Sequence, residues 1–337
     1  MDFDFSSEQY LLRDTLRELL TRECTPQQVR AAWDDPTGRS DRRWRSLGEL
    51  GVLGIMVPEA AGGFGGDEVD TVLLLEEVGR HVLPEPFMEH AALAAPLLAH
   101  SGTDAQREAW LPRLVAGAAV ATVGTTDQRY VVDGDADLVL LEVDGELHAL
   151  PADRVTAEPR RSVDHGRRLF AVTAETGDDT RMAGGAAGLR WLRQHAAAAT
   201  AAQLVGVAAA MHERTLAYVR EREQFGRRIA SFQAIQHKLA EGWVQLEMAR
   251  SAVQYAAWAL AADAPDAEVA VSVAKAAAGD AERRVNHDAL QLHGGIGFTW
   301  EHDLHLWLKR GRALESAWGD ADLHRRRIAD HVYATAG

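Results

Sequence analysis

The stretches Arg222-Glu-Gln-Phe-Gly226 and Gln291-Leu-His-Gly-Gly-Ile-Gly-Phe298 decide the fold of this chain. A guanidinium at Arg222 can bind a pyrophosphate through paired, charge-assisted hydrogen bonds, and Phe225 can cover a ring. The glycines leave backbone N–H groups open to a close ligand, because no Cβ stands in the way. Each piece alone is weak, since an arginine near a helix end is usually a solvated cap and paired glycines are usually a turn. Together the two stretches indicate a cofactor-contact site.

Long helices are predicted on both sides of these stretches. Residues on one helical face lead up to Arg222, namely Leu204, Ala208, Met211, Thr215 and Tyr218. A second stripe begins at Leu239, a third helix is predicted over residues 266–292, and two shorter helices follow it. Long helices joined by short loops are typical of an antiparallel four-helix bundle. We therefore predict a C-terminal bundle domain over residues 186–337.

The rest of the chain divides by composition into two parts. Residues 1–117 have a helical pattern, which opens with a capping-box signature at Ser6 and Gln9. Residues 118–185 instead carry branched apolar runs, and Asp144-Gly145 between two such runs is a strong hairpin signal. We predict a mainly α protein with an N-terminal helical domain, a short β-rich middle domain and the C-terminal bundle.

Composition excludes several classes of partner. The 337 residues carry a formal net charge of −14, which argues against nucleic acid or an anionic membrane surface as the main partner. The single cysteine, Cys24, fits a reducing cytoplasm, and the N-terminus shows no signal peptide. No apolar run approaches the ~20 residues that span a bilayer. We expect a cytoplasmic protein without a metal site.

In this order and at these spacings, the two opening stretches resemble the flavin-contact signature of the acyl-CoA dehydrogenase family. The resemblance extends over the whole chain and includes Gly51-Val-Leu-Gly-Ile-Met-Val-Pro58. It implies an acyl-CoA substrate, an obligate oligomer, and FAD bound across a subunit interface and held mainly by a neighbouring chain. The contacts implied for this chain are Arg222, Gln224, Phe225, Phe232, Gln233, Gln291, Gly294 and Gly295.

The chain departs from the family at the catalytic base. The family's C-terminal pattern places Trp318 on the usual glutamate, and a tryptophan cannot accept the α-proton of a thioester. Some members carry the base at the start of the first bundle helix, where this chain has Ala196. Nearby Asp320 and Asp322 are better explained as N-terminal helix caps. The two remaining candidates, His195 and His324, are better explained by a surface or packing role.

A second departure concerns the middle domain. In the family this domain contacts the isoalloxazine ring through a Trp-x-Thr-type strand, whereas residues 118–185 are short and contain no tryptophan. Thr122, Thr125 and Thr126 are weak remnants of such a cradle. We therefore expect that the chain does not bind FAD unaided.

The run Gly294-Gly-Ile-Gly-Phe-Thr-Trp-Glu-His302-Asp-Leu-His-Leu-Trp-Leu-Lys-Arg310 resembles actinobacterial acyl-CoA dehydrogenases that act on steroid side chains. This resemblance implies an α2β2 heterotetramer in which a homologous subunit carries the catalytic glutamate. We expect a subunit of such an enzyme, inactive alone. Two alternatives stay open: a self-sufficient homo-oligomeric flavoenzyme with altered chemistry, and a scaffold that kept the fold without activity.

Overall fold

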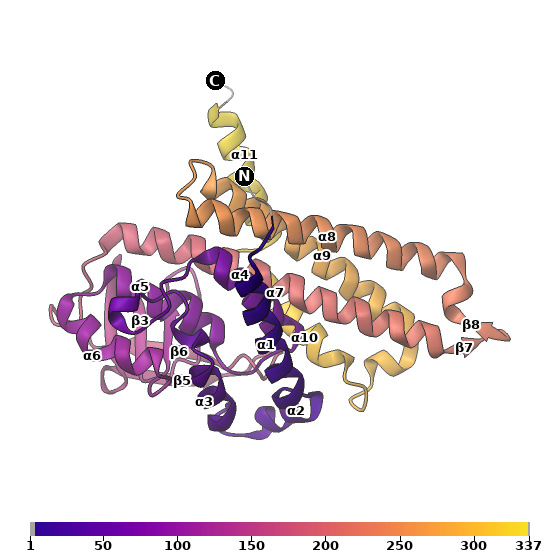
Figure 1. Ribbon diagram of the computed structural model, residues 1–337, viewed down its shortest axis with the longest axis horizontal. Coiled ribbons are helices and arrows are strands. Elements are labelled where there is room, and N and C mark those ends of the chain that lie inside the picture. Colours follow the sequence, from indigo (N-terminus) through magenta and orange to yellow (C-terminus); the bar gives the residue numbers. More distant parts are fainter. Residues whose placement is uncertain (1–3, 336–337) are drawn as a thin grey trace.

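The first part of the chain forms helices, most of which have a side-chain cap at the N-terminal end. The computed structural model describes residues 4–335, and Figure 1 shows their arrangement. Ser6 and Gln9 form the predicted capping box. The helices are α1 (Ser7–Glu23), α2 (Pro26–Asp34), α3 (Asp41–Glu49), α4 (Glu68–Arg80), α5 (Ala95–Ser101) and α6 (Asp104–Val115), with 3₁₀ turns η1 (Val52–Gly54) and η2 (Glu59–Ala61) and a π-helical segment η3 (Met88–Ala94).

Two small sheets follow, as the branched apolar runs predict. Their strands are β1 (Ala121–Gly124), β2 (Val131–Val132), β3 (Leu138–Val143), β4 (Glu146–Pro151), β5 (Val155–Arg160) and β6 (Leu169–Ala174), with a 3₁₀ turn η4 (Ala152–Arg154). One sheet has the order β1-β3-β4 and the other β2-β6-β5. Asp144 and Gly145 join β3 to β4 with φ of 50° and 82°, the left-handed conformation that a two-residue hairpin turn needs.

The last part of the chain returns to helix, as predicted. Its elements are α7 (Gly185–Glu221), α8 (Gln233–Ala261), α9 (Ala267–His293), α10 (Leu304–Ser316) and α11 (Ala321–Thr335), with the short strands β7 (Glu223–Gln224) and β8 (Arg227–Arg228) and the turns η5 (Ile229–Ser231) and η6 (Gly294–Phe298). In Figure 1, α7 runs from the β strands to the far end of the bundle, and β7 and β8 project from that end. The end of α7, the start of α8 and the end of α9 therefore meet there.

Helix α7 crosses α4 at backbone contact. A Cβ built on Gly206 would lie 1.9 Å from the carbonyl oxygen of Glu76, and one on Gly79 would lie 2.2 Å from that of Gln203. The alanine-rich stretch 196–202 is almost wholly buried in the same region, as its close-packed composition predicts. These small residues let one core run through the helices and the β1-β3-β4 sheet. Among residues 4–335, no helix is long and apolar enough to cross a bilayer.

Candidate cofactor-contact site

The first predicted segment is a hairpin rather than the helix end that the sequence suggests. Helix α7 stops at Glu221, and the N–H of Arg222 donates to Tyr218 O at 2.9 Å. Strands β7 and β8 then pair, with Phe225 and Gly226 in the turn at φ of 55° and 75°. A left-handed conformation at two successive residues allows this tight reversal. Phe225 is 89% exposed, so it is outside the core of the chain.

The second predicted segment turns away from α9 at its last residue, His293. Gly294 follows with φ of 62°, which explains a glycine there. Gly295 is different, because its φ lies outside the left-handed region and a Cβ on it would meet nothing within 4 Å. The chain itself therefore gives no reason for a glycine at Gly295. A group that approaches from outside the chain would supply one.

The predicted contact side chains lie at one end of the bundle, and three of the polar ones are free. Arg222, Gln233 and Gln291 are exposed, and within residues 4–335 their side chains make no hydrogen bond or ion pair. Phe232 caps the start of α8 and lies edge-on to Phe225, with ring centroids 6.2 Å apart. A guanidinium, two amides, an exposed ring and open backbone N–H groups fit the pyrophosphate and ring edges of FAD.

Arg227 packs on one of the predicted contact residues, which the sequence did not indicate. Its guanidinium carbon lies 3.9 Å from the centroid of Phe232, a cation–π geometry. The side chain of Gln224, by contrast, folds back to donate from Nε2 to Glu223 O at 2.9 Å. The hairpin register, which pairs Gln224 with Arg227, was not visible in the sequence because the short β7–β8 reversal follows directly on a long helix.

Trp318 lies in the loop between α10 and α11, at the position that the resemblance gives to the base. It is half-buried with φ of 58°, a left-handed conformation that is rare for a bulky residue. The buried Lys275 clamps this loop, since its Nζ donates to Glu315 O at 2.9 Å and to Gly319 O at 2.7 Å. Burial lowers the pKa of Lys275 to about 8. The loop is thus fixed by contacts from α9.

The acidic and imidazole groups near Trp318 have structural partners. Asp320 Oδ1 accepts from Leu323 N at 2.8 Å and caps α11, as predicted, while Asp322 is exposed and pairs with Arg325. The His324 ring is buried between Trp318 O, 3.0 Å from Nε2, and an α9 serine hydroxyl. Burial lowers the pKa of His324 to about 4. These contacts indicate a packing role for His324.

Ala196 starts a face of α7 that leads into a cluster of buried ion pairs. Gln203, two turns further on, lines a small internal cavity together with Glu89, Arg167 and Arg310. Arg167 Nη2 lies 2.9 Å from Glu89 Oε1, and both side chains are buried. Arg310 pairs with Asp164 from the β5–β6 connection. Charged side chains of the chain itself therefore line the space beside Gln203.

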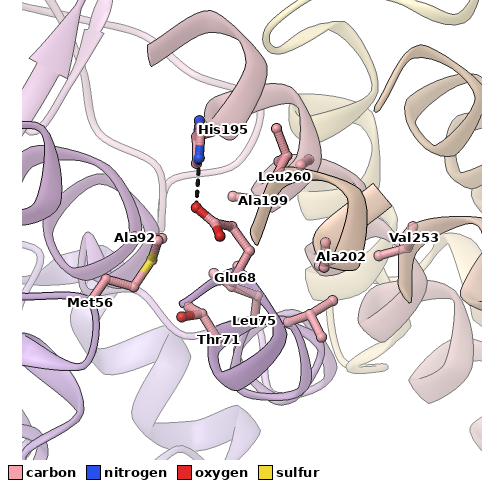
Figure 2. Close-up of a pocket in the computed structure, with 13 residues that line it drawn as sticks. Met56, Glu68, Thr71, Leu75, Ala92, His195, Ala199, Ala202, Val253 and Leu260 are labelled. Carbon is pink, nitrogen blue, oxygen red and sulfur yellow. Dashed lines mark hydrogen bonds and ion pairs between the residues drawn. The ribbon is translucent and has the colours of Figure 1, made fainter. Parts of the chain in front are cut away.

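His195 belongs to a different face of α7, which lines a separate apolar cavity (Figure 2). Its Nε2 lies 2.6 Å from Glu68 Oε1, and its ring stacks on Trp191 with centroids 3.8 Å apart. The cavity has a volume of about 30 Å³ and lies between α4, α7 and α8. Its other walls are mostly alanine, valine and leucine side chains, namely Val72, Leu75, Ala92, Ala198, Ala199, Ala202, Val253, Ala257 and Leu260. No local signal marks the Glu68–His195 pair, because 127 positions separate its members.

The threonines at the end of β1 are held within the chain. Thr122 Oγ1 donates to Val132 O at 2.6 Å, and Thr126 Oγ1 donates to Glu142 Oε2 at 3.1 Å. Thr125 is buried, and its hydroxyl has no partner among residues 4–335. Two of the three remnant hydroxyls are thus used internally, which fits a flavin cradle poorly.

The chain is similar to known proteins over nearly its whole length. The family model "Acyl-CoA dehydrogenase, N-terminal domain" matches residues 6–118, and "Acyl-CoA dehydrogenase, C-terminal domain" matches residues 185–333. "Acyl-CoA dehydrogenase IpdE2" of Mycolicibacterium smegmatis is 33% identical over 97% of this chain and 100% of its own length. The solved "Tcur3481-Tcur3483 steroid ACAD G363A variant" is 30% identical over 98% of both chains, with a TM-score of 0.87. The ChsE4-ChsE5 complex from Mycobacterium tuberculosis is 27% identical over 99% of both chains, with a TM-score of 0.89. The chain belongs to the acyl-CoA dehydrogenase family, a family of FAD-dependent oxidoreductases.

Proposed function

We propose that this chain is one subunit of a heteromeric acyl-CoA dehydrogenase that acts on a steroid-derived acyl-CoA. It contributes FAD contacts across the subunit interface, and a homologous partner supplies the catalytic glutamate in an α2β2 assembly. The observation that carries the proposal is the contrast between two sites. Arg222, Gln233 and Gln291 are exposed and unpaired, whereas the base positions hold Trp318 and Ala196.

The surface around the contact residues supports an intersubunit role. Large apolar side chains are exposed along α8 and the adjoining turns, namely Phe225, Trp243, Val244, Met248, Ile296 and Phe298. Exposed apolar residues that gather in one region mark interaction sites in soluble proteins. Two of the similar solved structures carry names that pair two proteins, Tcur3481-Tcur3483 and ChsE4-ChsE5, and the first is also called a steroid ACAD. A homologous partner subunit is therefore the occupant that these observations favour.

The residues indicate how the two subunits share the site: this chain contributes flavin contacts and the partner contributes the base. Bound flavin supplies the hydride acceptor for α,β-dehydrogenation of a thioester. The Arg222 guanidinium is suited to the pyrophosphate, and the Gln233 and Gln291 amides to adenine or ribose edges. A positioned base contributes roughly 10²–10⁴-fold in rate, and it must come from the partner. Within this chain, neither Trp318 nor Ala196 has a side chain that can accept the α-proton of the thioester.

The test is the flavin affinity of the complex with its homologous partner. Replacing Arg222 by Ala removes charge-assisted bonds worth about 1.5–3 kcal/mol each, so we expect FAD affinity to fall about tenfold or more. Arg326→Ala, an exposed arginine on α11, is the matched control. Unchanged affinity in Arg222→Ala would favour the scaffold alternative. A stoichiometric flavin spectrum from this chain alone would favour the self-sufficient enzyme.

Three further expectations belong to this proposal. The boundaries at residues 117/118 and 185/186 stay predictions, which limited proteolysis would test. The isolated chain is inactive and colourless, as absorbance of the purified chain would show. The assembly works in the cytoplasm, which fractionation of the native host would test.

A further inference from the structure

Tyr218 contacts both segments of the flavin-contact site. Its carbonyl oxygen accepts the N–H of Arg222 at 2.9 Å, where the β7–β8 hairpin begins. Its ring stacks on His293, with centroids 4.3 Å apart and planes 18° from parallel. Its hydroxyl lies 3.4 Å from His293 O, one residue before Gly294. Its side chain therefore joins the last turn of α7, which leads directly into Arg222, to the residue that precedes Gly294.

His293 is held firmly on the opposite side of the stack. Its side chain is buried, and Nδ1 lies 2.8 Å from Ala289 O. A carbonyl oxygen only accepts, so Nδ1 carries the proton. Burial lowers the pKa of His293, which keeps the ring neutral at physiological pH. Gly297 packs on it so closely that a Cβ there would lie 3.0 Å from the His293 Cβ.

His302 completes the cluster from the entry of α10. Its ring centroid lies 5.0 Å from that of His293 at 64°, and 6.5 Å from that of Tyr218 at 81°. Its Nδ1 accepts the N–H of Leu304 at 3.1 Å, which fixes the ring to the start of the helix. Stacked and edge-on ring pairs contribute beyond the area they bury. Three rings from α7, α9 and the α10 entry therefore meet between the two segments.

We propose that Tyr218, His293 and His302 are positioning residues for the flavin-contact site. They hold the hairpin that starts at Arg222 and the turn at Gly294–Gly295 at one fixed separation, so that both reach the same cofactor. This inference rests on the proposed function. The hairpin needs such a support because two paired residues on each side make it marginal by itself. A contact site requires placement to about half an ångström, which neighbouring packed side chains provide.

The experiment compares substitutions in the complex with its homologous partner. Tyr218→Leu removes the stack, Tyr218→Phe keeps it, and Tyr255→Leu removes a tyrosine that lies beside Trp258 in α8. FAD dissociation constants are measured by flavin fluorescence, and melting temperatures at saturating FAD. We expect the FAD dissociation constant to be about tenfold larger for Tyr218→Leu. It should stay close to the wild-type value for Tyr218→Phe and for Tyr255→Leu. The two leucine variants should melt at similar temperatures.

The outcomes distinguish a failure of the positioning role from a failure of the proposed function. If Arg222→Ala weakens FAD binding and Tyr218→Leu does not, the positioning role is overturned while the proposed function stands. If neither substitution weakens it, the proposed function itself fails. If Tyr218→Leu does not fold, His302→Leu replaces it, because His302 is only half-buried. A severalfold larger FAD dissociation constant in His302→Leu supports the positioning role, and an unchanged one overturns it.

Discussion

The carbonyl of Trp191 fixes the orientation of the His195 ring and so the character of its contact with Glu68. That oxygen lies 2.8 Å from His195 Nδ1, so Nδ1 carries a proton. The 2.6 Å contact between Nε2 and Glu68 Oε1 then needs a second proton, on either the ring or the carboxyl group. The pair therefore shares one proton at the polar end of an otherwise apolar cavity. His195 is oriented by this contact and not toward the Ala196 face.

Glu68→Ala should destabilise the protein, because it leaves His195 Nε2 without a partner beside the cavity. The cost of an unsatisfied buried polar group is about 1–3 kcal/mol. Glu68→Gln should cost less, since its amide N–H can donate to Nε2. Urea unfolding at pH 7 measures both, with the exposed Glu108→Ala as control. Equal stability of Glu68→Ala and the wild type would contradict the shared-proton contact.

Sequence reasoning succeeded at single residues where the contact is local. The capping box at Ser6 and Gln9 and the α11 cap at Asp320 each join positions three apart, so spacing alone specifies them. It failed for Glu68 and His195, because nothing in either neighbourhood indicates a partner 127 positions away. Arg222 and Gln291 were predicted as contact residues through a signature and stay predictions; both are exposed, as the proposed use requires.

At the scale of elements, helices and hairpins were predictable wherever periodicity or turn chemistry acts within a short window. The β3–β4 hairpin follows from Asp144-Gly145, and α9 begins and ends within about one residue of the predicted 266–292 range. The π-helical segment η3 and the β7–β8 hairpin were not predictable. Segment η3 depends on packing against β1 and α7, for which local propensity carries no signal. The β7–β8 hairpin is exposed, and its two-residue pairing follows directly on a long helix, whose pattern hides it.

Helix α10 packs on α9 through a buried carboxyl group, which makes the contact pH-dependent. Gly311 of α10 leaves space for Glu282, since a Cβ there would lie 1.8 Å from Glu282 Oε1. Oε1 accepts from Asn286 Nδ2 at 2.9 Å, and Oε2 has no hydrogen-bond partner among residues 4–335. Burial raises the pKa of Glu282 to about 7, from 4.5. Between these values the folded protein binds more protons than the unfolded chain, so this group lowers stability as pH rises through that window.

Glu282→Gln should therefore stabilise the protein at pH 8 and have little effect at pH 5. The gain in unfolding free energy at pH 8 is the cost of ionising the buried carboxyl group in the folded protein, of order 1–3 kcal/mol. The glutamine can keep the acceptor for Asn286. Urea midpoints at the two pH values measure the difference. A gain of the same size at both values would show that the pKa of Glu282 is not raised.

At the scale of the whole molecule, the connection between β5 and β6 ties the small sheets to the helices. Asp164 pairs with Arg310 of α10, and Arg167 pairs with Glu89 of η3; all four side chains are buried. Arg310 also donates to Leu83 O at 2.9 Å. These contacts fix the sheets against two helical regions that lie far apart in the sequence. Composition could predict the sheets, but not the charged contacts that orient them.

Asp164→Ala should destabilise the whole molecule by about 3–5 kcal/mol, because it leaves a buried guanidinium without its carboxylate. In a double-mutant cycle with Arg310→Met, the two losses should fall short of additivity by at least about 1 kcal/mol. The same cycle on the exposed pair Glu158 and Arg160 should give a coupling below about 1 kcal/mol. Additive losses for the buried pair would show that it does not join the sheets to the bundle.

The crossing of α4 and α7 has a consequence for the freedom of this sequence to vary. Gly79 and Gly206 are the points where one helix backbone rests on the other. Even alanine, the smallest change, would place a methyl group 1.9 Å from Glu76 O at position 206. Any residue other than glycine at position 79 or 206 would therefore force the two helices apart. The two glycines thus fix the distance between α4 and α7, and with it the course of α7 toward the hairpin that follows it.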